Sequence, residues 1–450
     1  MSIKLKPTCL VAAGLLLGTP AWAVDLVGVF ELAEQSDPRL QAAEYRREAT
    51  GENKDIAWAN LLPQIGVGGT WSRGDSETDI SGISQTIESD IDTDNYRAEL
   101  RQSLYRQANY ESLDIARGQI SQAEAVYQVA YQDFLLRVAE SYFTVLTLTD
   151  GVTFAEAEEK AFQRQFEQAE QRFEVGLTAV TDVHEARATY DNARARAIVA
   201  RNNLADAREA LHELTGQYFE EYDALQEVLP LVEPDPANSS DWVDIALQNN
   251  PSVLSSRAAL DVAEANMRLA RAGHYPTLDL VASYNRFADN AYTYTDPISG
   301  LQRTGSFEND DSQIALQLQV PIYQGGRVSA QTRQARYLMD ATGQDLDDVQ
   351  RGVVREAENA FRAVLAGIQE VQAFNQAMIS AESALEATQA GFEVGTRTIV
   401  DVLIAEQRKY QAQRDNSIAR HAYIINHLRL KSVAGLLAAD DLRVVNQLLE

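Results

Sequence analysis

Two long stretches of the chain contain no proline, although its 450 residues include eleven prolines. They span 64–229 and 322–450 and are rich in Ala, Gln, Glu and Arg. Proline breaks a helix interior, whereas these four residue types favour helix. In the first stretch about seventy residues have no forced break, and at about 1.5 Å of rise per residue they predict a helix of roughly 100 Å. An ordinary globular core does not need such a length.

Small and apolar residues recur in the first stretch in alternating steps of four and three. They are Ala116, Ile120, Ala123, Tyr127, Ala130 and Phe134. This spacing is typical of a coiled-coil seam, and alanine allows two helices to approach closely. The long helices are therefore expected to pack as coiled coils.

The chain contains one unit twice, because the same landmarks recur in the same order in its two halves. The matching positions are Pro38 and Pro251, Pro63 and Pro276, Phe173–Gly176 and Phe392–Gly395, and Gly216 and Gly435. We predict a first repeat over 24–229, a linker over 230–243 and a second repeat over 244–450. Each repeat is expected to hold a helix, a strand pair and two long helices, the long helices being about 106–173 and 180–214, then 325–391 and 398–433.

The predicted strands alternate apolar and polar residues, with aromatic residues near their ends. They cover about 64–73, 95–105, 277–287 and 312–322. One apolar and one polar face are typical of strands in a transmembrane β-barrel. Four strands cannot close a barrel, and lipid does not tolerate an open edge, so several chains must share one barrel. The stretches 74–95 and 288–312 are expected to be polar external loops.

The N-terminus has the pattern of a secretory signal peptide over 1–23. A basic start precedes an apolar stretch from Leu10 to Leu17 and the small-residue site Ala21-Trp22-Ala23. The mature chain is expected to begin at Val24. The single cysteine, Cys9, lies in the removed segment, so no disulfide is expected.

Charge and composition argue against several classes of function. With 39 Lys and Arg against 66 Asp and Glu, the net charge of −27 does not suit nucleic-acid binding. The five histidines lack zinc-ligand spacing, and no phosphate-binding glycine loop follows a strand. We therefore expect no enzyme, no cofactor and no metal site.

A barrel shared by several chains favours a pore for general export. Two other functions remain open alternatives. A coiled-coil scaffold could span the periplasm without conducting, but it would not need polar inward faces on all four strands. An exporter dedicated to a metal ion would favour Met, His or Cys along its path. The chain has only four Met and one Cys, and Met1 and Cys9 lie in the predicted signal peptide, so general export is favoured.

Several motifs resemble, in order, those of the outer membrane factor family, the TolC-type trimeric outer-membrane efflux proteins. They are Leu62–Gly66, Arg172–Leu177 with Thr181–Val183, Ala200–Leu204, Pro276–Leu280, Pro321–Gly326 and Val394–Leu403. The resemblance covers essentially the whole mature chain. It implies an α+β membrane protein with two structural repeats per chain.

The resemblance also implies an assembly and partners. Three chains would form a homotrimer with a shared twelve-stranded barrel in outer-membrane lipid, continued by a long α-helical coiled-coil tunnel in the periplasm. The tunnel would dock with a periplasmic adaptor (membrane fusion) protein and an inner-membrane transporter of the RND, ABC or MFS type. Drugs, toxins or secreted proteins would leave passively through this duct.

The family closes the periplasmic end of its tunnel with polar links between helices. The matching positions here are Gln171, Thr181, Asp182, Phe392, Arg397 and Asp401. A cation at the start of a helix opposes the helix dipole, so Arg397 is expected to have a carboxylate partner, and we predict Asp182. A purely structural reading also exists, since Thr398 and Asp401 have capping-box spacing after Gly395.

Two positions depart from the family pattern. Phe392 stands where the best-known member has a tyrosine, so that hydroxyl link cannot form. Ile404 stands where that member has the second of two acidic residues at the constriction. The gate is therefore expected to depend more on Arg397 and Asp182, and block by cations at the mouth to be weaker.

Overall fold

The computed structural model describes residues 23–80, 85–295 and 301–450, so most of the predicted signal peptide lies outside the described residues. The chain divides into two compact units. Unit 1 holds the part up to Leu40, Tyr131–Ala246 and Glu356–Glu450, and unit 2 holds Gln41–Ala130 and Leu247–Arg355. Each unit draws on both halves of the chain, so the compact units differ from the predicted repeats. The reason is that the long helices α4 (Gln107–Glu174) and α8 (Arg327–Glu393) each contribute to both units.

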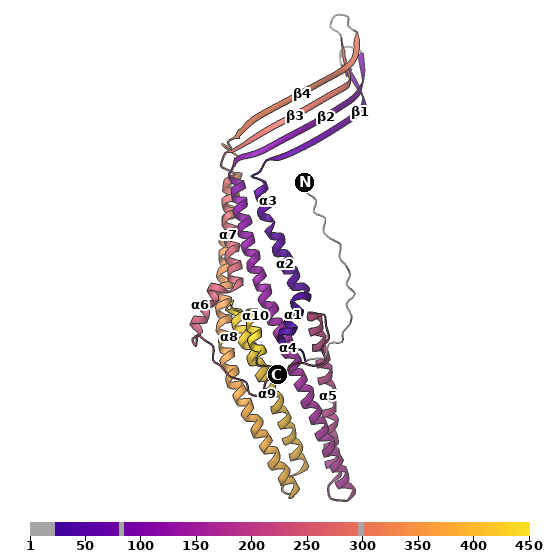
Figure 1. Cartoon of the computed structure of the whole chain (residues 1–450), viewed down its shortest axis with the longest axis vertical. Coiled ribbons are helices and arrows are strands. Elements are labelled where there is room, and N and C mark those ends of the chain that lie inside the picture. The colour runs from indigo at the N-terminus through magenta and orange to yellow at the C-terminus, as the bar shows by residue number, and fades with distance from the viewer. Residues whose placement is uncertain (1–22, 81–84, 296–300) are drawn as a thin grey trace. The chain divides into compact units, whose positions relative to one another are not determined.

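Unit 2 contains a four-stranded antiparallel sheet in the order β1-β2-β3-β4, whose strands run side by side (Figure 1). The strands are β1 (Gln64–Ile80), β2 (Gln85–Arg106), β3 (Thr277–Thr295) and β4 (Gln302–Gln319). The central pair joins the two halves of the chain, with Arg97 opposite Asn285.

The strands are longer than predicted, and the prediction of loops over 74–95 and 288–312 is wrong for most of those residues. Asp75 pairs with Asp90, and Ala288 pairs with Glu308. Backbone pairing does not depend on side-chain polarity, so each hairpin continues past its apolar segment. The tips, 81–84 and 296–300, lie outside the described residues. The predicted strand 312–322 ends earlier, at Gln319, ahead of Pro321.

The sheet has one apolar and one polar face. Residues directly opposite each other in neighbouring strands share a face. One row across the four strands is Ile65, Leu100, Ala282 and Ile314, and an adjacent row on the other face is Gly66, Glu99, Ser283 and Gln313. Apolar side chains lie uncovered in the single chain: Val67 is 83% exposed and Ile314 is 80% exposed. The alternation predicted from the sequence is therefore present in the sheet.

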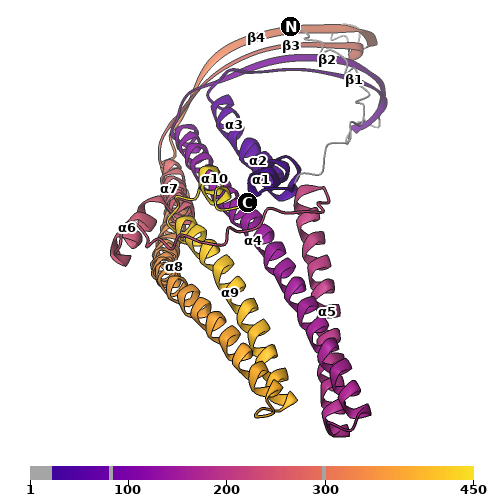
Figure 2. The same ribbon diagram turned by 60° about the horizontal axis from the view of Figure 1, so that its bottom comes forward.

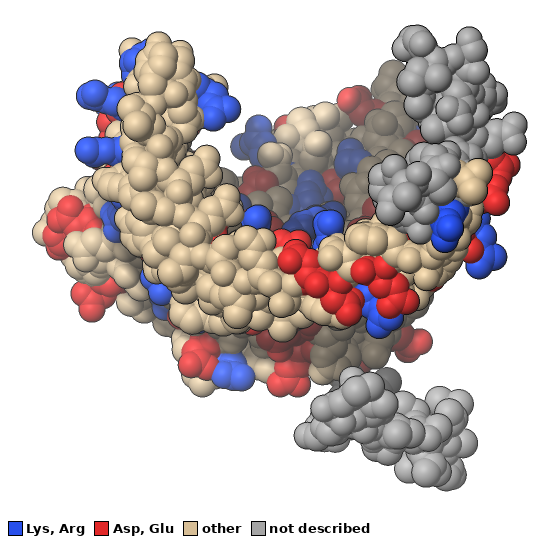
Figure 3. All heavy atoms as spheres, turned by 90° about the horizontal axis from the view of Figure 1, so that it is seen from above, with Lys and Arg blue, Asp and Glu red and all other residues tan. Residues whose placement is uncertain are grey.

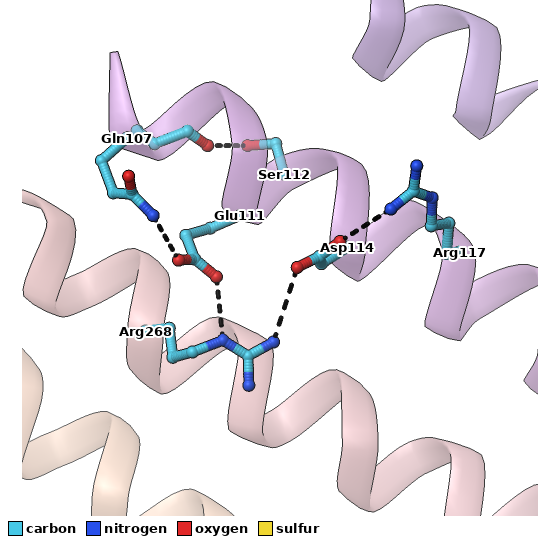
Figure 4. A network of polar contacts seen from close by, with 7 residues as sticks. Gln107, Glu111, Ser112, Asp114, Arg117 and Arg268 are labelled. Atoms are coloured by element: carbon cyan, nitrogen blue, oxygen red, sulfur yellow. Dashed lines mark hydrogen bonds and ion pairs between the residues drawn. The ribbon is translucent and has the colours of Figure 1, made fainter. Parts of the chain in front are cut away.

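The helices of unit 2 are α3 (Asn53–Ala59), α7 (Pro251–Ala272), most of α2 (Pro38–Gly51) and the first parts of α4 and α8. A polar network joins α4 to α7 (Figure 4). Arg268 Nε lies 2.9 Å from Glu111 Oε2, and Gln107 Nε2 donates to Glu111 Oε1 at 2.7 Å. Gly118 explains the close approach, because a Cβ there would lie 2.7 Å from Val262 Cγ2.

Unit 1 is built on two helical hairpins, α4–α5 and α8–α9, which Figures 1 and 2 show from two directions. The second helices of the hairpins are α5 (Val180–Thr215) and α9 (Ile399–Val433). The shorter helices of this unit are α1 (Leu26–Ser36), the first part of α6 (Ser239–Asn249) and α10 (Ala439–Asn446). The four long helices begin and end within two residues of the ranges expected from the sequence.

Aromatic residues of α4 form much of the core of unit 1. Phe134 and Tyr142 are fully buried, and Phe143 is 2% exposed. The Tyr142 hydroxyl lies 2.9 Å from the carbonyl oxygen of Asp223 and 3.1 Å from that of Val24. It thereby ties Val24 and the segment after α5 to α4.

Within the described part of the chain, every helix is too short or too polar to cross a bilayer. Charge is also dispersed: on the face seen from above, acidic and basic side chains form small separate groups between broad uncharged areas (Figure 3).

Candidate functional site at the helix turns

The two hairpins of unit 1 turn in the same way. Gly176 and Gly395 have φ angles of 74° and 79°, a conformation that glycine adopts without strain. In the first turn Leu177 N donates to Arg172 O at 2.8 Å, and in the second Thr396 N donates to Gly391 O at 2.8 Å. These bonds satisfy carbonyls at the helix ends, as in Schellman-type caps. The glycines are therefore explained by turn geometry.

An apolar cluster joins the hairpins above these turns. It contains residues of α4, α5 and α9: Phe162, Ala169, Ala186, Ala193, Ile399 and Leu403. Phe392 and Val400 pack against it. Small alanines on α5 let the neighbouring helices approach, so α9 lies against both helices of the other hairpin.

Phe392, a predicted gate residue, contacts Arg172, which was not predicted to belong to the gate. The guanidinium carbon of Arg172 lies 4.7 Å from the centroid of the Phe392 ring, which is within cation–π distance. This contact links the ends of α4 and α8 without a hydroxyl. Gln171, beside Arg172, has an exposed side chain. Arg172 lies within a recognised motif, but only the fold reveals that an aromatic ring faces it.

Asp182 and Thr181 lie together in the first turn of α5. Asp182 accepts hydrogen bonds from the hydroxyl of Thr178 and, at 3.5 Å, from that of Thr181. A carboxylate at this position also interacts favourably with the helix dipole. The ion pairs found in the described part of the single chain do not include Arg397 with Asp182. One chain by itself therefore brings Thr181 and Asp182 together but does not join them to Arg397.

Asp401 closes a capping box at the start of α9. Thr398 N donates to Asp401 Oδ2 at 2.9 Å, and Asp401 N donates to Thr398 Oγ1 at 3.2 Å. The hydrogen bonds from the backbone and hydroxyl of Thr398 lower the pKa of Asp401, and the positive charge of Arg397 adds to this effect. Asp401 thus stays ionised at neutral pH while it caps the start of the helix.

Arg397 needs space that a glycine provides. A Cβ at position 391 would lie 2.8 Å from Arg397 Cγ, and Arg397 N donates to Gly391 O at 3.2 Å. Gly391 was not singled out from the sequence, because its role depends on the fold of the turn. Ile404, three residues after Asp401 on α9, is 44% exposed. The prediction of weaker cation block at this position stays a prediction.

Replacing Thr398 with alanine should loosen the start of α9. The loss of a hydroxyl cap costs about 1 kcal/mol, which corresponds to a roughly fivefold larger population of the locally open state. Hydrogen exchange at the Asp401 amide measures this directly. Thr388→Ala, in the last two turns of α8, is the matched control and should leave that amide unchanged. Equal exchange in the Thr398→Ala variant and the natural chain would contradict the capping role.

Comparison with known proteins agrees with this architecture. The family model described as outer membrane efflux protein matches residues 29–217 and 242–436. The outer membrane protein TolC of Vibrio cholerae is 37% identical over 98% of each chain, and the alkaline protease secretion protein AprF of Pseudomonas aeruginosa is 30% identical over 96% of this chain and 88% of that one. The crystal structure of the outer membrane protein VceC from Vibrio cholerae matches with a TM-score of 0.75 at 19% identity, covering 91% of this chain and 96% of that chain. The chain belongs to the outer membrane efflux protein family, a family of outer-membrane channels with a periplasmic part and not a family of enzymes.

Proposed function

We propose that three copies of the chain form one passive exit duct, gated at the helix turns, in which each sheet supplies four of twelve strands. The observation that carries this proposal is the two-faced sheet. Its apolar face suits lipid and its polar face suits a water-filled lumen. In the sheet order, β1 and β4 each have one neighbouring strand among the described residues. An open edge is costly in lipid, so each edge is expected to pair with another copy.

Two neighbouring residues of β3 test the orientation of the sheet. The sole cysteine is Cys9, so single cysteines placed in the mature chain can be labelled selectively. Ser283→Cys lies in the polar row and Ala282→Cys in the apolar row. With trimers in liposomes, a charged, water-soluble maleimide should label Ser283→Cys and leave Ala282→Cys largely unlabelled. Equal labelling, or the reverse order, would contradict a lumen on the polar face.

The gate is proposed to close through contacts between copies. Asp182 already accepts from hydroxyls of its own chain, yet its carboxylate has room for a cation. Arg397 follows an exposed turn at the end of the other hairpin. A link from Arg397 of one copy to Asp182 of its neighbour supplies the partner that a cation at a helix start requires. Three such links would close one ring.

The turns themselves are proposed as the docking place for a periplasmic adaptor, behind which an inner-membrane transporter supplies the energy. Val175, Leu177 and Val394 are 69%, 71% and 76% exposed. Apolar side chains gathered at exposed turns favour a protein partner. Relatives named as secretion proteins, AprF and the proteases secretion protein PrtF of Dickeya chrysanthemi, support protein cargo in addition to drugs and toxins.

A further inference from the structure

Glu158 is a fully buried carboxylate on α4, about four turns before that helix ends. It is not part of the gate positions described above. A buried carboxylate must be paired and hydrogen-bonded to remain ionised. The groups that contact Glu158 therefore decide whether it is charged and which helices it holds together.

Glu158 binds one arginine from its own hairpin and one from the other. Its Oε1 lies 2.9 Å from Arg196 Nη2 on α5, and its Oε2 lies 3.1 Å from Arg414 Nη1 on α9. Each carboxylate oxygen therefore has its own cation. The bond to Arg414 is the one that crosses from the α4–α5 hairpin to the α8–α9 hairpin.

The bond between Glu158 and Arg414 lies about four turns from the turn end of α4 and of α9. Another ion pair between α4 and α9, Glu140 with Arg429 at 2.6 Å, lies farther from the turns. Between this bond and the turns, α4 and α9 contact each other through the apolar cluster that contains Phe162 and Leu403. Among the ion pairs of the described residues, Glu158–Arg414 is the one between α4 and α9 nearest the turns. A movement that separates the two hairpins at their turns would therefore stretch the Glu158–Arg414 bond before it reaches the Glu140–Arg429 bond.

Other charged groups surround the same place. Glu406, on α9, is 6% exposed, and its Oε2 has no hydrogen-bond partner among the residues that the structure describes. Burial raises the pKa of Glu406, the charge of Glu158 adds to that rise, and Arg164 and Lys409 oppose it. When Glu406 is ionised its charge repels that of Glu158, and the cation from α9 offsets this repulsion.

We infer that Glu158 is a second latch of the duct, which holds α9 to the α4–α5 hairpin and releases Arg414 when the periplasmic end opens. This inference rests on the proposed gated duct. It differs from the proposed link between Arg397 and Asp182 in position, since it lies four turns above the helix turns, and in kind, since it acts within one chain.

The two arginines provide a matched test, because each removes one cation from the same carboxylate. Single-channel conductance is measured in planar bilayers on the Arg397→Ser background, where the gate at the turns is already weakened. Arg414→Gln should raise conductance about twofold further. Arg196→Gln breaks a bond within one hairpin and leaves the bond between the hairpins in place, so it should raise conductance less than Arg414→Gln does. Glu156→Gln, which removes an exposed pair with Arg201 between α4 and α5, is the control that should change nothing.

The outcomes separate this inference from the proposed function. If Arg397→Ser channels conduct and Arg414→Gln adds nothing, the duct stands and the second latch is wrong. If Arg414→Gln and Arg196→Gln raise conductance equally, Glu158 serves only as packing support, and the latch is again wrong. Where Arg414→Gln trimers do not assemble, Glu158→Gln keeps the side-chain size and is measured in the same way, with the same twofold rise expected. Absence of any conductance would count against the duct itself.

Discussion

Replacing Arg397 with serine is expected to raise the single-channel conductance of the trimer several-fold. The substitution removes three symmetry-related cations from the proposed ring with Asp182, and the closed mouth loses charge-assisted bonds that serine cannot replace. The backbone of the turn should persist, because Gly395 and the Thr398–Asp401 box shape it independently of the guanidinium. Conductance in a planar bilayer at fixed salt is the readout.

Arg408→Ser is the matched control for this change. Arg408 is an exposed arginine on the same helix, α9, beyond the capping box. Its loss changes the net charge by the same amount, and conductance should stay at the natural value. If Arg397→Ser and Arg408→Ser behave alike, Arg397 has no part in holding the mouth closed.

The second large effect is a loss of stability in mild acid that depends on His421. This side chain on α9 is 5% exposed, and its Nδ1 lies 2.8 Å from Thr147 Oγ1 on α4. Burial lowers the pKa of His421 from 6.5 to about 4, although the charge of Asp150 opposes the shift. The folded chain therefore holds a neutral ring where the unfolded chain would bind a proton.

The direction of the effect follows from these two pKa values. Above about pH 6.5 both states are neutral and stability is fully present. Between that pH and about 4 only the unfolded state takes up the proton, so the free energy of unfolding falls by at most about 1.4 kcal/mol per pH unit per chain. Denaturant unfolding at several pH values should show this slope. His421→Gln should flatten it, whereas His184→Gln, at an exposed position, should not; parallel slopes in all three proteins would contradict the role of His421.

The helices were predictable because their limits are set locally. Gly176, Gly395 and the pair Thr398–Asp401 carry the turn and cap chemistry in their own residue types. The predicted range 398–433 accordingly matches Ile399–Val433 closely. The alternation of the strands was equally visible, since it is a pattern of neighbouring residues.

Other features depend on residues far apart in the chain and could not be read from local pattern. Arg172 meets Phe392, and Glu158 meets Arg414, only after two hairpins have packed together. The length of the strands escaped prediction for a different reason, because backbone pairing continues through polar residues such as Asp75 and Asp90. The division into compact units likewise arises from helices that each serve both units.

The most direct test of an exit duct is the behaviour of the natural trimer in a planar lipid bilayer. Purified mature protein added to one side should give discrete, uniform conductance steps that are small in the closed state. Well-inserted trimers that give no steps, both in the natural form and as Arg397→Ser, would contradict the duct and favour a scaffold that does not conduct.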